Sequence, residues 1–303
     1  MRRSQSGGID PMTVMEFSTE ARQQARVSHL CIGPFRAQGV NLSGSDFVAG
    51  IPSPSAALGF VGAIARRLGV TGWDHKAILI IHDLEERRGR VRGEQKQAGK
   101  GTITPLEISE SVTGHGVFSI VAEIPGQHDV TDIISAVMRM RFAGGSIFAP
   151  YRRALPDVVH PIQDGDLLSA LMRLPRGMVL SPPTGRSGTS IVSFGEETSL
   201  EAIAMRSYAS EKQGGSGYIV PAPVGYKILT QTLTQDPPAA CRDRSIPFAL
   251  VDSAVGLAEF VSVRNRDLFR DIDASFANHG WSWACRDDLR MFSQLHLDAA
   301  ASQ

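Results

Sequence analysis

Hydrophobic residues recur at helical spacing between Pro54 and Leu68. The positions that share one face of this predicted helix are Ala57, Phe60, Val61, Ile64 and Leu68. Ser53 is placed to cap the helix start, with the proline in the first turn, and Gly69 is placed to end the helix in a left-handed conformation. We therefore predict a helix here, with backbone N–H groups at its start that suit an anion such as phosphate.

Short apolar runs bounded by glycine and proline predict strands. These runs cover residues 27–32, 77–82, 117–124, 178–180, 191–194 and 218–221. The polar, glycine-rich stretch 36–50 predicts a loop, and residues 131–142 predict a second helix. Residues 248–260 have a helical or mixed pattern.

This order of elements predicts an α+β protein. The expected form is a ferredoxin-like or RRM-like antiparallel sheet with helices on one face and inserted loops. We expect residues 21–292 to form a single domain, preceded by a disordered tail over 1–20 and followed by a C-terminal tail over 293–303.

Composition narrows the class of protein. The chain has 31 Lys and Arg against 31 Asp and Glu, and this zero net charge counts against a free-standing nucleic-acid binder. It still allows a subunit that holds a short RNA and shares the electrostatic work with partners. Three scattered cysteines fit a reducing cytoplasm and predict neither a disulfide framework nor a metal site. No apolar run approaches ~18 residues, so we expect no membrane span.

Arginines stand beside glycines in two places. Arg66 and Arg67 end the first predicted helix, where they suit either phosphate contacts or a solvated helix end. Arg139 and Arg141 precede three residues that allow a close backbone approach and add a hydroxyl, namely Gly144, Gly145 and Ser146. On spacing alone this second group reads as a helix end with arginines that face solvent.

Aromatic and alternating charged residues give weaker signals. Tyr226 is a candidate for stacking on an RNA base, although a half-buried structural tyrosine is commoner. Arg242 and Arg244 flank an aspartate, which suits a local ion pair or a phosphate contact. The eight histidines are far apart and form no metal or triad pattern; His82 and His115 are the candidates for a general base.

Four ordered blocks carry a resemblance to a known family. They are residues 50–69, 140–147, 174–180 and 217–260, the last holding Gly-Tyr-Ile-Val-Pro-Ala-Pro-Val-Gly-Tyr, Arg-Asp-Arg and Gly-Leu-Ala-Glu-Phe. Together they resemble the RAMP-superfamily subunit of type I-F CRISPR surveillance complexes that binds the 5′ handle of the guide RNA (the "Csy two" protein, a relative of the fifth Cas class).

The resemblance implies a function and a set of partners. It implies a non-catalytic, RAMP-like RNA-binding domain without cofactor or metal, in an antiviral ribonucleoprotein of the cytoplasm. The implied partners are the 5′ handle of the CRISPR RNA (crRNA), the large subunit that reads the protospacer-adjacent motif, and the backbone subunit that coats the crRNA. Target DNA is met only through the complex. The implied RNA-binding residues are Ser53, Ser55, Arg66, Arg67, Arg139, Arg141, Gly144, Gly145, Ser146, Tyr226, Arg242 and Arg244.

Two alternatives remain open from the sequence. A metal-independent endoribonuclease of the same superfamily would cut CRISPR-repeat RNA and would use His82 or His115 as its general base. A metabolic enzyme with a phosphate-bearing ligand would use the helix start at Pro54.

Overall fold

The computed structural model describes residues 27–44, 48–92, 108–149, 158–162, 166–183, 217–228, 251–267, 269–286 and 289–293. Its described helices are α1 (Pro54–Arg67), α2 (Val130–Val137), α3 (Leu167–Arg173) and α5 (Ile272–His279). Its strands are β1 (Val27–Asn41), β2 (Lys76–Arg92), β3 (Ile108–Pro125), β4 (Arg141–Phe142), β5 (Gly145–Phe148), β6 (Val159–Pro161), β7 (Met178–Ser181), β8 (Gly217–Ile228), β9 (Val251–Ser262), β10 (Trp281–Arg286) and β11 (Leu289–Ser293).

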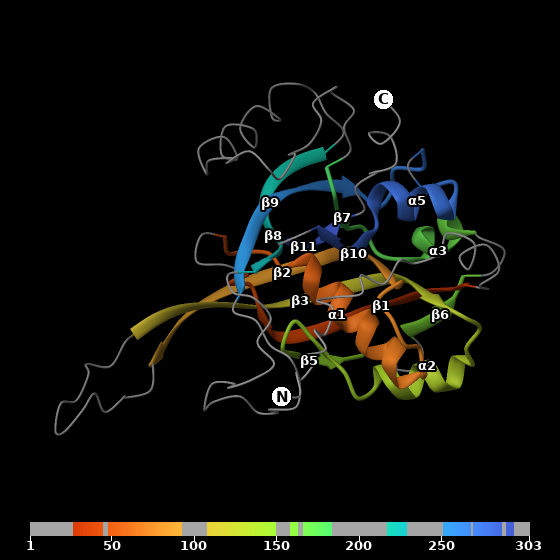
Figure 1. The fold of residues 1–303 in the computed structure, drawn as a ribbon, viewed down its shortest axis with the longest axis horizontal. Coiled ribbons are helices and arrows are strands. Elements are labelled where there is room, and N and C mark those ends of the chain that lie inside the picture. Colours follow the sequence, from red (N-terminus) through yellow and green to blue (C-terminus); the bar gives the residue numbers. More distant parts are fainter. Residues whose placement is uncertain are drawn as a thin grey trace, which may run out of the picture.

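All described strands join one 11-stranded sheet, whose order is β10-β11-β8-β9-β7-β2-β3-β1-β5-β4, with β6 on β1. Each pairing is antiparallel. The predicted α+β class with an antiparallel sheet is confirmed (Figure 1). The part β1-α1-β2-β3-α2-β5, with sheet order β2-β3-β1-β5, is compatible with the expected ferredoxin-like topology.

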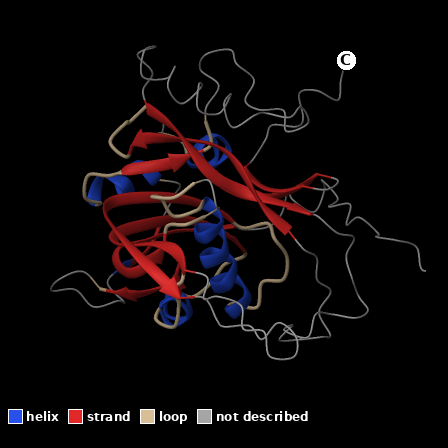
Figure 2. Cartoon of the chain, turned by 90° about the vertical axis from the view of Figure 1, so that its left-hand side faces the viewer, coloured by secondary structure: helices blue, strands red, loops and turns tan. Residues whose placement is uncertain are grey.

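The sheet curls until it meets itself. The start of β2 pairs with β10 at Trp281 and Ala77, while the next residues of β2 pair with β7. Strands β2, β7, β9, β8, β11 and β10 therefore close a ring, and the indole N–H of Trp281 donates to the carbonyl of Leu180 across it at 2.7 Å. Helix α1 lies inside this curl and contacts β2 and β3 as well as β8 and β10 (Figure 2).

Two hydrophobic cores cover the two faces of the sheet. The larger core packs α1 and α2 on the concave face, around the rings of Phe35, Phe60, Phe118 and Phe142. The smaller core packs Leu171 of α3 and Phe276 of α5 against Cys31 and Val121 on the opposite face. The expected arrangement has helices on one face; the structure adds α3 and α5 on the second, because the apolar residues of β1 and β3 there need their own cover.

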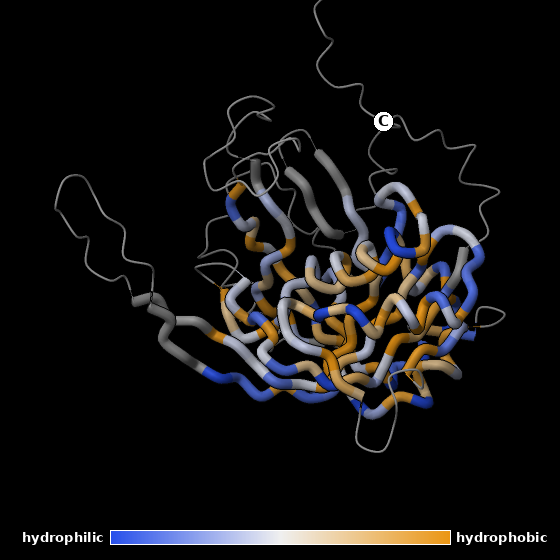
Figure 3. The backbone as a smooth tube through the Cα atoms, turned by 90° about the horizontal axis from the view of Figure 1, so that it is seen from below, coloured by the Kyte–Doolittle hydropathy of each residue, from blue (hydrophilic) through white to orange (hydrophobic). Residues whose placement is uncertain are grey.

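Strands β2 and β3 extend from the body as a long paired arm (Figure 1). Strand β2 is hydrophilic where the arm leaves the body (Figure 3). Its exposed side chains there are Asp83, Glu85, Glu86 and Arg87. The sequence analysis predicted both strands but limited them to their apolar runs. The polar residues that extend these strands into the arm give no hydrophobic pattern to detect.

Several predicted boundaries were wrong. The loop at 36–50 is strand up to Asn41, because a register shift between Ile32 and Phe35 lets β1 continue past Gly33 and Pro34. The second helix ends at Val137 instead of 142, and the residues after it become β4. Residues 251–262 are a strand, not a helix. The predicted strand 191–194 and the tail 1–20 lie outside the described residues, as does the C-terminal tail beyond Ser293.

Candidate nucleic-acid interface

The start of α1 has the predicted cap. The hydroxyl oxygen of Ser53 accepts the N–H of Ser55 at 3.2 Å, and its own proton is donated to the carbonyl of Pro223 in β8 at 2.8 Å. Because that carbonyl can only accept, the hydroxyl of Ser55 donates to Ser53 across 2.6 Å. These bonds fix the helix start to a strand that lies far away in the sequence.

The same bonds correct the prediction of an anion site at this helix end. Pro54 has no N–H, the N–H of Ser55 goes to Ser53 Oγ, and the N–H of Ala56 goes to the Ser53 carbonyl at 2.9 Å. The N–H donors of the first turn are therefore already used in hydrogen bonds to the cap residue. The metabolic-enzyme alternative relied on these donors for a phosphate, and the N–H groups of Ser55 and Ala56 are hydrogen-bonded within the chain.

A pocket of about 250 Å³ opens beside this helix start. Four segments build its wall: the end of β1 with the residues that follow it, the first turn of α1, the turn between β4 and β5, and the middle of β8. Its lining residues are Asn41, Ser43, Gly44, Ser53, Ser55, Ala56, Ala143, Gly144, Pro223, Gly225 and Tyr226. None of these side chains is charged. The pocket thus offers small hydroxyl, amide and backbone groups with one partly exposed tyrosine ring.

Close packing of the backbone shapes this pocket. A Cβ on Gly44 would lie 2.1 Å from Cγ of Pro223, so only glycine lets the two chain segments approach this closely. The carbonyl of Gly44 also accepts the Ser253 hydroxyl of β9 at 3.1 Å. The side chains of Asn41 and Ser43 bind neighbouring backbone, at Ser43 N and Val112 N respectively.

The segment from Ala136 to Gly144 connects the two ends of α1. At one end, the guanidinium of Arg67 donates to the Ala136 carbonyl at 3.0 Å. In the middle, the ring of Phe142 lies edge-on to Phe60 at 6.1 Å. At the other end, Gly144 and Ala56 line the same pocket. The segment therefore runs alongside α1 in the opposite direction.

Four of the predicted site residues meet at the pocket: Ser53, Ser55, Gly144 and Tyr226. Arg66 and Arg67 do not, because they lie at the far end of a 14-residue helix, about 20 Å away. Arg67 is held by the Ala136 carbonyl, and Arg66 is exposed. The described residues therefore do not bring Arg66 and Arg67 together with the four site residues at the pocket.

Arg141 and Ser146 lie on the outward face of the sheet, away from the pocket. They are cross-strand partners in the β4–β5 hairpin, and both are exposed, while Phe142 and Gly145 between them are buried. Arg139 is exposed just after α2. Arg242 and Arg244 lie outside the described part of the chain, so their predicted role stays a prediction.

Sequence reasoning missed part of the pocket and part of the outward face. Asn41 and Ser43 were assigned to an unstructured loop, and only the pairing of β1 with its neighbours could have placed them. Arg36, Gln38 and Phe148 were not considered, since no local motif marks them. Pro223 and Gly225 lay inside a quoted block beside Tyr226, which was a usable signal.

Both histidine candidates for the general base of an endoribonuclease form hydrogen bonds within the chain. His82 Nδ1 lies 3.1 Å from the carbonyl of Arg176, which can only accept, so Nε2 accepts the hydroxyl of Ser119 at 2.8 Å. Burial lowers the pKa of His82, and Ser119 is fully buried. His115 Nδ1 accepts the N–H of Gly39 at 3.1 Å, so its other nitrogen carries the proton in the neutral ring.

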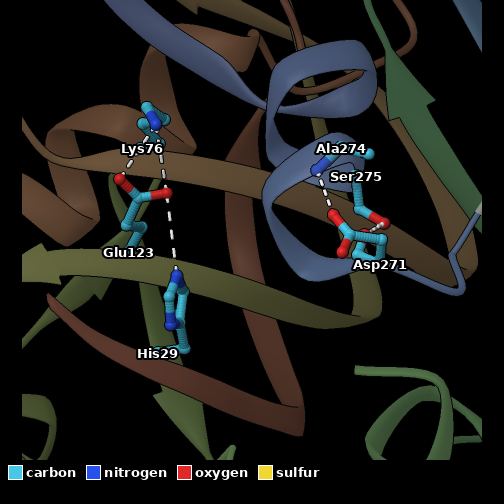
Figure 4. Close-up of polar contacts among 6 residues, drawn as sticks. All are labelled: His29, Lys76, Glu123, Asp271, Ala274 and Ser275. Carbon is cyan, nitrogen blue, oxygen red and sulfur yellow. Dashed lines mark hydrogen bonds and ion pairs between the residues drawn. The ribbon is translucent and has the colours of Figure 1, made fainter. Parts of the chain in front are cut away.

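Two carboxylates elsewhere in the fold have structural roles. Figure 4 shows Glu123 between Lys76, at 2.9 Å, and His29, at 3.8 Å, in a row across β2, β3 and β1. Burial raises the pKa of Glu123, but the contacts with His29 and Lys76 outweigh burial and leave this pKa lowered. The same view shows the carboxylate of Asp271 accepting the Ala274 N–H at the start of α5.

Two further features bear on function within the described ranges. No group of three or more His, Cys, Asp or Glu side chains there gathers as a metal site would require. No helix in that part of the chain is both long enough and apolar enough to cross a membrane.

The family comparison bears directly on this site. Residues 193–277 match the family model described as CRISPR-associated protein (Cas_Csy2). Comparison with curated proteins finds no match for this chain. The matched range includes the three pocket residues of β8, which are Pro223, Gly225 and Tyr226, and it overlaps the fourth of the blocks described above. This match over part of the chain supports a CRISPR-associated protein of the Csy2 family, whose members belong to multi-subunit complexes.

Proposed function

We propose that this chain binds the 5′ handle of the crRNA and seats one nucleotide of it in the pocket at the start of α1. One observation carries the proposal. The pocket is assembled from three of the four blocks that resemble the family, although these blocks lie far apart in the sequence: Ser53 comes from the first, Gly144 from the second and Tyr226 from the fourth.

The size and chemistry of the pocket support a base or a ribose as its occupant. Its volume of about 250 Å³ is below the ~300–1,000 Å³ of ordinary small-molecule pockets, so it suits one nucleotide unit. Its lining is uncharged, which suits hydrogen bonds to a base edge or a 2′-hydroxyl and stacking on Tyr226. The exposed arginines outside the pocket, such as Arg139 and Arg141, would bind the phosphates.

The remaining features of the proposal follow from the family. We propose that the chain is a non-catalytic, RAMP-type subunit of a type I-F-like antiviral complex in the cytoplasm. It would dock the large subunit and the first backbone subunit and would meet target DNA only through the complex. The hydrogen bonds at both ring nitrogens of His82 and at Nδ1 of His115 favour this reading over a repeat endoribonuclease.

Filling the pocket tests the proposal. Ala56 lines the pocket on α1, and Ala63 lies two turns further along the same helix face, outside the pocket. We expect Ala56→Leu to weaken binding of the repeat-derived 5′-handle RNA by about tenfold or more, measured by fluorescence anisotropy, because the loss of one stacked base has this magnitude. Ala63→Leu is the matched control and should bind like the unmodified chain. Equal affinity of the two variants for the handle would contradict the proposal.

A further inference from the structure

A second surface with nucleic-acid chemistry lies on the outward face of the sheet. Strand register places Arg36 opposite Phe148, and it places Gln38 opposite Ser146, which in turn pairs with Arg141. Directly opposed residues of antiparallel strands share one face, and residues two apart on a strand do as well. These five side chains, which we name the β1–β5–β4 face, therefore point to the same side of the sheet.

The β1–β5–β4 face is open to solvent. All five of its side chains are exposed, and Phe148 has 46% of its surface accessible. The alternate residues of the same strands, Ala37 and Phe142, are buried on the concave side against the core of α1. A single exposed phenylalanine is ordinary on a protein surface, so the distinguishing feature of Phe148 is the set of cations and hydrogen-bonding side chains that share its face.

Both charges among the described side chains of the β1–β5–β4 face are positive. Arg36 and Arg141 are both cationic, and the other two members, Gln38 and Ser146, are neutral hydrogen-bonding groups. The nearest acidic side chains in the same cross-strand rows are Asp83 and Glu85 on β2, beyond β3. At the usual strand spacing they lie about 10 Å from β1. They form an acidic border that confines a polyanion to the β1–β5–β4 face.

We propose that the β1–β5–β4 face binds single-stranded RNA next to the nucleotide in the pocket, with one base stacked on Phe148 and its phosphates at Arg36 and Arg141. This inference rests on the proposed function. The turn at Gly144 lines the pocket, while the two residues that flank its hairpin, Arg141 and Ser146, lie on the face. A Cβ at Gly144 would meet nothing within 4 Å, so there is open space at this turn for the RNA strand to pass.

Two substitutions at Phe148 distinguish base stacking from simple apolar contact. Phe148→Tyr keeps an aromatic ring and Phe148→Leu keeps apolar surface without one. With the full chain and a short fluorescein-labelled oligouridylate as the probe, we expect Phe148→Leu to weaken binding about tenfold and Phe148→Tyr to bind normally. Arg36→Gln should flatten the slope of log affinity against log salt by ~0.7. Thermal melting checks that the exposed substitutions leave the fold intact.

The pocket variant Ala56→Leu distinguishes this inference from the proposed function. Weaker binding by both Ala56→Leu and Phe148→Leu supports both. If Ala56→Leu weakens binding and Phe148→Leu does not, the pocket stands and the β1–β5–β4 face is not an RNA surface; a protein that docks there would be the remaining occupant. If neither variant weakens binding, both proposals fail. A matched oligodeoxyuridylate that binds as tightly as the RNA would overturn the assignment to RNA.

Discussion

The start and the end of α1 hold polar side chains in different settings. At the start, Ser53 and Ser55 bond to each other and to β8, and they border an uncharged pocket. At the end, Arg67 donates to the Ala136 carbonyl and Arg66 is exposed. One end therefore supplies shape and neutral hydrogen-bonding groups, while the other supplies positive charge and a contact with α2. The length of the helix separates the uncharged pocket from the positive charge at its end.

Replacing Phe142 should break both ends at once. Its buried ring packs on Phe35 at 5.6 Å and on Phe118 at 4.9 Å, and it holds the segment that runs alongside α1. We expect Phe142→Ala to lower the free energy of unfolding by about 3–5 kcal/mol, measured by chemical denaturation. Met138→Ala, in the same segment but 54% exposed, should change it by less than about 0.5 kcal/mol. Similar losses for the two variants would contradict the packing described.

Removing the hydroxyl of Ser53 should loosen only the start of the helix. Ser53→Ala loses the cap of Ser55 and the bond to Pro223, so we expect a loss of about 1–2 kcal/mol in thermal or chemical unfolding. Ser53→Thr keeps both bonds and serves as the control. If alanine is as stable as threonine here, the helix start is not fixed by this side chain.

The two arginines at the end of α1 should differ from each other. Arg67→Gln removes the donor to Ala136, and we expect it to cost about 1 kcal/mol or less because the site is exposed. Arg66→Gln should leave stability within about 0.5 kcal/mol. Denaturant midpoints of the two variants give the comparison, and a larger loss from Arg66→Gln would reverse the assignment of which arginine holds α2.

The carboxylate of Glu123, which lies in the sheet away from the two ends of α1, should make stability depend on pH. The pKa of Glu123 is lowered in the folded protein, so its contribution to stability is complete above about pH 4.5, the ordinary value for glutamate, and is lost as the pH falls through the lowered pKa. Glu123→Gln should therefore flatten the acid side of the profile of stability against pH. An unchanged profile between about pH 2 and 4.5 would show that Lys76 and His29 do not stabilise this carboxylate.

Local patterns in the sequence were sufficient for the elements whose signals are local. The apolar spacing over 54–68, the cap at Ser53 and the turn at Gly69 all appear in α1 as expected. The predicted strand over 178–180 was likewise found in β7. These features depend on neighbours a few residues apart, and the sequence displays such neighbours directly.

Features that depend on distant partners could not be predicted. Strand β1 continues through Gly33 and Pro34 because β3 pairs with it on both sides of the irregularity. The pocket needs Gly44 beside Pro223, and Arg67 finds its acceptor on α2; neither pairing leaves a trace at sequence spacing. The resemblance to the family compensated for part of this, since it grouped three blocks that the fold brings together at the pocket.

The salt dependence of handle-RNA binding separates the neutral pocket from the charged surface in one experiment. Affinities of the unmodified chain, Ala56→Leu and Arg141→Gln are measured over a range of salt concentrations. Ala56→Leu should weaken binding equally at every salt concentration, giving a parallel line, because the pocket lining carries no charge. Arg141→Gln should reduce the slope by ~0.7, the loss of one phosphate contact on a single strand. A changed slope for Ala56→Leu with an unchanged slope for Arg141→Gln would contradict the division of roles between pocket and arginines.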